Sequence, residues 1–210
     1  MPNYKLASGA RVPRVTEIIG ILAKPQLIHW AWELGCQGLD YRKVRADAGD
    51  IGTLAHYLIM CHLKGITPST KDYSREKIDK AETCFLKFLD WERKNPFKPL
   101  LVEQSLVSER YKFGGTIDCL GSFPNPGYED SVDLLDFKTG KAIYAESAWQ
   151  LAGYRLLLQE KGYQVRQHRI LRIGRDETEG TEEKILTRVL LAREIFLTCL
   201  TLYQLMKEER

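Results

Sequence analysis

Cysteine is scarce in this sequence, and no two cysteines are spaced as a shared site would require. The five of them are scattered along 210 residues, and none forms a C-x-x-C pair. A disulfide framework, a zinc site or an iron–sulfur centre needs a more regular set. The sequence therefore excludes a disulfide-rich secreted domain, predicts no iron–sulfur cluster and favours a cytoplasmic location.

Long apolar runs are also absent. No run of about eighteen apolar residues, the length that spans a membrane, occurs in the chain. Residues 1–14 lack the apolar core of a secretory signal, so we expect no membrane partner. The nucleotide-binding pattern G-x-x-x-x-G-K-[S/T] is missing as well, so any helicase activity would require another chain.

Charge of one sign is not in large excess. The chain has 31 Lys and Arg against 28 Asp and Glu, which leaves a net charge of +3. This balance is compatible with a polyanionic partner but does not indicate one. With 44% hydrophobic residues the chain can bury one substantial core. We expect a single domain over residues 1–210, with a helical part at 1–98 and an α/β catalytic core at 99–210.

Helical signals dominate the first half of the chain. Thr16 is placed as an N-cap, Pro25 suits a first helical turn, and Asp50 can cap a third helix that runs through Lys64. Apolar residues at helical spacing predict a fourth helix over residues 72–94.

Short apolar runs separated by Gly, Pro and Asn dominate the second half. Strands are expected over residues 100–107, 112–120, 131–137, 165–173 and 184–189, with a loop at 124–127 and helices over 145–161 and 191–207. This order predicts an α/β fold in which a mixed sheet is flanked by helices.

Two aspartates and a lysine in the predicted strands form the strongest chemical signal. Asp136 and Lys138 share one face of a strand because side chains alternate, while Phe137 points into the opposite layer. Asp118 lies in the preceding strand. Asp133 has the opposite parity from Asp136 and is therefore the weaker candidate.

Carboxylates that meet on neighbouring strands favour metal-assisted chemistry. They repel one another, and a divalent cation relieves that repulsion while polarising a phosphodiester and lowering the pKa of a water. A neighbouring lysine orients the water and stabilises the charge that develops on the phosphate. The alternative is that Asp118 and Lys138 are exposed charges at a strand edge, which form a surface salt bridge.

Four short motifs occur in a specific order. They are G-T-L-A-H at 52–56, G-G-T-I-D at 114–118, L-D-F-K-T-G at 135–140 and Q-L-A-G-Y at 150–154. In this order they resemble the motifs of RecB-like PD-(D/E)XK nucleases. That group includes phage exonucleases, CRISPR-associated RecB-like nucleases and the mitochondrial genome maintenance exonuclease. The segments at 11–16 and 27–30 also resemble the start of phage-type members.

The resemblance implies a restriction-endonuclease-like core and a role for each matched residue. The implied metal ligands are His56, Asp118, Asp136 and the backbone carbonyl of Phe137, and the catalytic residues are His56, Asp118, Asp136 and Lys138. Gln150 and Tyr154 would contact the catalytic strand or the substrate, since their spacing places them on one helix face. The implied cofactor is Mg²⁺ or Mn²⁺. The four cysteines that hold an iron–sulfur cluster in some members have no counterpart here.

Several of these residues also have a structural interpretation. A histidine such as His56 on an apolar helix is, by itself, more often structural than a ligand. Gln150 and Tyr154 also suit a polar residue and a core aromatic on an amphipathic helix. Glu103 is either an additional acidic residue near the metal or a solvent-facing charge, and the two interpretations are comparable.

Other polar residues carry weaker signals. His29, His62 and His168 have no motif context and are expected to be structural. Phosphate contacts are an option for Lys112, Thr139, Lys141 and Arg155, although a solvated face is the commoner explanation. Residues 176–183 predict an exposed acidic loop between two strands, away from the path of DNA.

The motif set implies a metal-dependent deoxyribonuclease, and the phage-like opening favours an exonuclease on single-stranded ends in recombination, repair or phage DNA processing. DNA is the expected partner, with recombination or replication proteins as further partners. One alternative is a structure-specific or flap endonuclease with the same site. Another is a catalytically inert module for nucleic-acid binding or scaffolding. The intact Asp118, Asp136 and Lys138 argue against an inert module.

Overall fold

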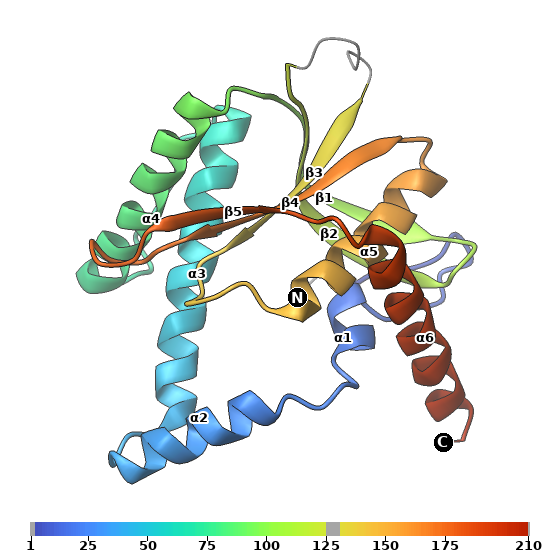
Figure 1. Ribbon diagram of the computed structural model, residues 1–210, viewed down its shortest axis with the longest axis horizontal. Coiled ribbons are helices and arrows are strands. Elements are labelled where there is room, and N and C mark those ends of the chain that lie inside the picture. Colours follow the sequence, from blue (N-terminus) through green and yellow to red (C-terminus); the bar gives the residue numbers. More distant parts are fainter. Residues whose placement is uncertain (1–2, 125–130, 210) are drawn as a thin grey trace.

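Helices form the first part of the chain, and a sheet with intervening helices forms the second (Figure 1). The computed structural model describes residues 3–124 and 131–209. The helices are α1 (Val15–Ile19), α2 (Pro25–Cys36), α3 (Tyr41–Lys64), α4 (Arg75–Lys94), α5 (Ala145–Glu160) and α6 (Val189–Glu208). The strands are β1 (Lys98–Ser108), β2 (Phe113–Ser122), β3 (Val132–Lys138), β4 (Val165–Ile173) and β5 (Thr181–Ile185).

One mixed sheet organises the described residues. Its strands lie in the order β1-β2-β3-β4-β5. β3 and β4 are parallel, whereas every other neighbouring pair is antiparallel. Parallel strands need a crossover connection, and α5 supplies it. The predicted α/β class, with a mixed sheet flanked by helices, is confirmed.

Helices α3 and α4 cover one face of the sheet (Figure 1). Apolar side chains from the second half of α3 and from α4 pack against β3 and β4. Phe88 of α4 meets Phe137 of β3 edge to face, with ring centroids 5.5 Å apart. Both rings are buried, and such pairs stabilise a core beyond the area they bury. This layer therefore holds α3 and α4 against the strand that carries the predicted catalytic residues.

Helices α1, α5 and α6 cover the other face. Phe113 of β2 and Phe196 of α6 lie at the centre of this layer, with ring centroids 5.1 Å apart. α5 runs against β3 and β4 and contributes fully buried residues such as Leu151 and Leu157. Because α5 joins β3 to β4, its first turns come close to the end of β3.

Residues 25–50, which we call the arm, extend away from the sheet (Figure 1). The arm consists of α2 and the first part of α3. α2 has no buried residue, and the buried residues of α3 begin at Ile51. Ile28 and Trp32 on α2 are 74% and 65% exposed. The arm therefore adds little to the core.

The third helix begins earlier than the sequence predicts. Its first residue is Tyr41, and its N-cap is Asp40, whose carboxylate accepts a hydrogen bond from the Arg42 backbone N–H at 2.9 Å. Asp50 lies inside α3, where its carboxylate is 2.6 Å from the Lys77 ammonium of α4. The prediction that Asp50 caps this helix was wrong, because Asp50 instead forms an ion pair between α3 and α4.

Two other helix starts also differ from the predictions. Thr16, the predicted N-cap, lies inside α1, and the N-cap of this helix is Arg14. The helix predicted from residue 72 begins at Arg75, after Ser74. Of the predicted loop at 124–127, residues 125–127 lie outside the described residues.

The last strand lies earlier than the predicted range of 184–189. In β5, Glu182 Oε2 is 3.1 Å from Arg172 Nε of β4, and Glu183 Oε1 is 2.6 Å from Arg169 Nη1. These ion pairs let acidic residues with low strand propensity join the sheet. The predicted acidic loop is therefore shorter than expected, because its last residues belong to β5.

α6 is the one helix among the described residues that is long and apolar enough to cross a membrane by length and composition. Its buried residues, Ala192, Phe196, Cys199 and Leu200, pack into the same layer as α1 and α5. Only 22% of this apolar stretch is buried, so one side of α6 packs against the fold while leucines such as Leu190 and Leu205 are exposed.

Candidate active site

β2 and β3 part at the two predicted aspartates. The last pair at this end of their ladder is Cys119 with Leu135, and Asp118 and Asp136 are the next residues on each strand. The backbone N–H of Phe137 donates to Asp118 Oδ2 at 2.8 Å. A side-chain carboxylate thus replaces the next strand partner and ties β2 to β3 where their backbones separate.

Asp136 and Lys138 form a largely buried pair that contacts α5. The Asp136 side chain is 1% exposed, and its Oδ2 lies 2.6 Å from Lys138 Nζ. Lys138 Nζ donates to Gln150 Oε1 at 3.2 Å, and Gln150 Nε2 donates to the Tyr154 hydroxyl at 2.9 Å. The two motif residues of α5 therefore lie on one face, as their spacing predicts, and connect to Lys138.

His56, Glu103 and Asp118 come together from α3, β1 and β2. Their ligand atoms all lie within 4.8 Å of one another. His56 Nδ1 is 3.7 Å from Asp118 Oδ2, and the register of β1 with β2 places Glu103 opposite Asp118. A histidine nitrogen with carboxylate oxygens suits a divalent cation. This placement favours the interpretation of Glu103 as an additional acidic residue near the metal.

Glu103 is also unusual in its backbone and its ionisation. Its φ of 49° lies in the left-handed region, which non-glycine residues rarely adopt. Burial raises the pKa of its carboxyl group to about 7, Asp118 adds to the rise, and His56 opposes it. Backbone strain and a perturbed pKa at one residue are features that functional sites show.

The buried Asp136 and the partly buried Lys138 influence each other's ionisation. Burial raises the pKa of Asp136 to about 6 against the opposing effect of Lys138, and Asp118 adds to the rise. Burial alone would lower the pKa of Lys138, but the Asp136 and Asp118 carboxylates outweigh it, and the pKa is raised. Lys138 is therefore protonated, and the negative charges of Asp136 and Asp118 stabilise its ammonium group. Burial likewise raises the pKa of the Tyr154 phenol, which keeps it protonated.

The carboxylate of Asp136 has unused hydrogen-bonding capacity. Oδ1 has no hydrogen-bond partner among the described residues, and the contact of Oδ2 is the ion pair with Lys138. Buried acceptors that lack partners cost free energy. A divalent cation would satisfy them, so the residues present fit Mg²⁺ or Mn²⁺. The role of the Phe137 carbonyl as a further ligand stays a prediction.

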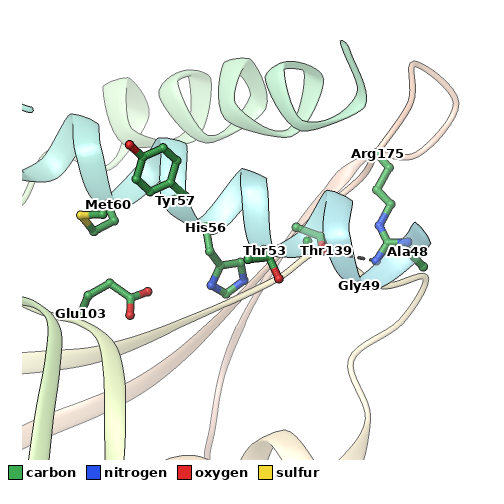
Figure 2. Close-up of a pocket in the computed structure, with 10 residues that line it drawn as sticks. Ala48, Gly49, Thr53, His56, Tyr57, Met60, Glu103, Thr139 and Arg175 are labelled. Atoms are coloured by element: carbon green, nitrogen blue, oxygen red, sulfur yellow. Dashed lines mark hydrogen bonds between the residues drawn. The ribbon is translucent and has the colours of Figure 1, made fainter. Parts of the chain in front are cut away.

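A pocket of about 560 Å³ opens beside His56 and Glu103 (Figure 2). One face of α3 forms a wall of the pocket, and Thr139 and Arg175 contribute from the far ends of β3 and β4. A Cβ atom at Gly52 would lie 2.9 Å from Thr139 Oγ1. The glycine of the G-T-x-x-H motif therefore lets α3 approach β3 closely enough to bring His56 to the site.

The histidines without motif context lie away from this cluster. His62 Nε2 is 2.7 Å from Glu92 Oε2, so its ring faces α4. His168 is fully buried in β4, and His29 is on the exposed arm near Glu33. Of the four residues considered for phosphate contacts, Thr139 lines the pocket.

Arg175 is a pocket residue that the sequence did not single out. It lies just beyond the end of β4 and before the predicted acidic loop, and none of the loop residues 176–183 is among the residues that line this pocket. β3 and β4 are parallel, with Lys138 paired to Arg172. Residues just beyond the carboxyl ends of parallel strands meet at one edge of a sheet, and this rule could have identified Arg175.

Comparison with known protein families and with curated proteins gives no match for this chain. The assignment of a function therefore depends on the geometry of the site.

Proposed function

We propose that this protein is a Mg²⁺- or Mn²⁺-dependent nuclease that hydrolyses DNA phosphodiester bonds, with a restriction-endonuclease-like core of the RecB-like type. One observation carries the proposal: Asp118 and Asp136 meet where two strands part, next to the partly buried Lys138 and within reach of His56. Three motifs that are distant in sequence supply these residues, and the fourth supplies Gln150, which contacts Lys138.

The residues divide into a metal-binding group and a substrate-directed group. His56, Glu103, Asp118 and Asp136 would hold the cation, which polarises the scissile phosphodiester and lowers the pKa of the attacking water. Lys138 provides a positive charge close to both carboxylates and can stabilise the charge that develops on the phosphate. Gln150 orients Lys138 through its Oε1, and Tyr154 orients Gln150 in turn.

A purely structural ion pair explains this arrangement less well. The pair of Asp136 with Lys138 is not on the surface, because Asp136 is 1% exposed, and it leaves Asp136 Oδ1 without a hydrogen-bond partner in the described part of the chain. A fold that needed only stability gains little from such a buried pair. The pair is therefore better explained by a bound cation and an anionic substrate.

Digestion of DNA tests the proposal directly. End-labelled linear and closed circular single strands are incubated with the protein and Mg²⁺ or Mn²⁺. Cutting of linear strands alone supports the exonuclease, and cutting of circles supports the structure-specific endonuclease. Intact single-stranded, duplex and branched DNA would reject the nuclease and leave the inert binding module. Recombination, repair or phage DNA processing in the cytoplasm is the setting that we propose for the enzyme.

Matched variants test the site itself. Asp136→Asn preserves the shape of the side chain and removes its charge, and Lys138→Ala removes the ammonium group. Both should abolish cutting, while the control Lys161→Ala, which changes an exposed lysine just after α5, should cut like the wild type. A Lys138→Ala protein that cuts at the wild-type rate would leave the activity in place but reject this site.

A further inference from the structure

Arg175 brings a positive charge to the wall of the pocket without an acidic partner. Its Nη2 donates to Thr139 Oγ1 at 3.3 Å, and its Nε is buried with no hydrogen-bond partner among the described residues. Two neighbouring arginines behave differently, since Arg169 pairs with Glu183 and Arg172 pairs with Glu182. In the described part of the chain, no carboxylate lies within ion-pair distance of Arg175.

The acidic loop that follows Arg175 does not neutralise it. Glu179 Oε2 accepts a hydrogen bond from the backbone N–H of Arg175, not from its guanidinium. The Asp176 carboxylate accepts from the backbone N–H groups of Thr178 and Glu179. Lys87 of α4 donates to the backbone carbonyl groups of Asp176 and Glu179. These contacts hold the start of the loop in place and direct the carboxylates of Asp176 and Glu179 toward backbone N–H groups.

A partly buried guanidinium without an anion is costly. Transfer of a charge away from water is unfavourable unless the charge is paired, and a buried N–H without an acceptor adds to the cost. A guanidinium has five N–H donors in a planar fork, and this shape matches the oxygens of a phosphate group. The arrangement at Arg175 therefore fits an anion that enters from the pocket.

The pocket has two chemically different ends (Figure 2). Glu103 lies at one end and His56 is near the middle, whereas Thr139 and Arg175 lie together at the other end (Figure 2). A cation bound by the His56 cluster would attract one phosphate, and Arg175 with the Thr139 hydroxyl would attract another. Consecutive phosphates of one strand present this pattern of charge.

We propose that Arg175 and Thr139 form a phosphate-binding subsite, which holds a phosphodiester group of the substrate strand next to the one that is cut. The identity of the strand rests on the proposed nuclease function. The capacity of Arg175 to bind a phosphate does not depend on it, so the two claims can be tested separately.

The first experiment probes the anion site alone. The ¹H–¹⁵N NMR signal of the Arg175 side-chain Nε–H is identified by its loss in Arg175→Gln and followed while inorganic phosphate, and then thymidine monophosphate, is added without metal. We expect this signal to shift and saturate, whereas the arginine Nε–H signals of Arg169 and Arg172 should hardly move. A signal that does not respond to either anion would overturn the subsite.

The second experiment measures the contact with DNA. Binding of a short single-stranded oligonucleotide is measured at several salt concentrations, with Ca²⁺ in place of Mg²⁺. Loss of one phosphate contact reduces the slope of log affinity against log salt by about 0.7 for a single strand. We expect Arg175→Gln to show this reduction and about tenfold weaker binding, which corresponds to the loss of one charged hydrogen-bonding group.

Two further variants serve as controls. Arg188→Gln removes the same charge from an exposed arginine that does not line the pocket, and should bind and cut like the wild type. Arg175→Lys keeps the charge but loses the planar fork, so it should keep the salt slope and bind less tightly than the wild type. It also provides a readout if Arg175→Gln unfolds at a lower temperature.

The outcomes separate the two proposals. If the wild type cuts DNA but Arg175→Gln matches its affinity and salt slope, the subsite is wrong and the nuclease stands. If the wild type neither binds nor cuts DNA while Arg175 responds to phosphate, the nuclease is wrong and an anion-binding site remains.

Discussion

Gly115 helps to position Tyr154 of the candidate site because it has no side chain of its own. A Cβ atom at this position would lie 2.6 Å from Tyr154 Cε1 and 3.2 Å from Val15 Cγ2. The glycine in G-G-T-I-D thus provides the space in which the Tyr154 ring packs against β2. Through Gln150, that ring supports Lys138, so the motif glycine contributes to the site without contacting it.

We predict that Gly115→Ala destabilises the protein by about 1–3 kcal/mol, the usual cost of an additional methyl group in a packed region. Activity should fall as well, because Tyr154 must shift. Denaturant unfolding and the DNA digestion assay measure the two effects. Gly35→Ala on α2 is the control, since a Cβ there meets nothing within 4 Å. Equal stability of Gly115→Ala and the wild type would contradict the close approach.

The metal ligands permit a prediction that does not require activity. We expect His56→Ala and Glu103→Gln each to weaken Mn²⁺ binding about tenfold or more, since even residues behind the ligands contribute that much in metal sites. Isothermal titration with Mn²⁺ measures the affinity. His62→Ala is the control, because this histidine faces Glu92 on α4. Unchanged Mn²⁺ affinity in Glu103→Gln would contradict its role as a metal ligand and favour the interpretation of Glu103 as a solvent-facing charge.

At the scale of elements, α3 combines two different environments in one continuous helix. Its second half is buried against β3 and α4, and it carries Gly52 and His56. Its first half belongs to the exposed arm with α2. Backbone hydrogen bonds without buried neighbours open more readily than those in a core.

We therefore predict that amide hydrogens in residues 25–50 exchange faster than those in residues 51–64. Hydrogen–deuterium exchange followed by mass spectrometry compares peptides from the two ranges, with α4 as an internal reference for core protection. Protection in α2 equal to that in α4 would show that the arm is packed against something in solution and would contradict this expectation.

At the scale of the whole molecule, one buried histidine links stability to pH. His168 is fully buried in β4, and neither ring nitrogen has a hydrogen-bond partner among the described residues. Burial, with a contribution from the positive charge of Arg155, lowers the pKa of His168 from 6.5 to about 4. The folded protein therefore keeps this ring neutral at pH values where the unfolded chain protonates it.

The sign of the effect follows from proton binding. Above pH 6.5 both states are neutral and the full stability is present, and as the pH falls toward 4 the unfolded state gains a proton first. We predict a loss of about 3 kcal/mol from this residue over that range. Denaturant unfolding at several pH values should show a shallower pH dependence in His168→Gln than in the wild type. Parallel curves would indicate that His168 is not responsible.

Much of the local organisation is visible in the sequence. Side-chain alternation in strands predicts the shared face of Asp136 and Lys138, and the helical repeat predicts the shared face of Gln150 and Tyr154 on α5. Both patterns act over a few residues. Errors occur where a distant partner decides the outcome. Glu182 and Glu183 enter β5 because arginines on β4 pair with them, and no pattern within residues 176–189 contains that information.

The sequence by itself determined the order of elements, the α/β class and the aspartates and lysine that form the centre of the candidate site, because each depends on local periodicity and residue type. Only the tertiary structure decided that Glu103 lies beside His56 and Asp118, and that Arg175 faces the same pocket. Both placements depend on strand register and on the close approach of α3 to β3. These are set by packing between segments far apart in the chain, which short-range patterns do not encode.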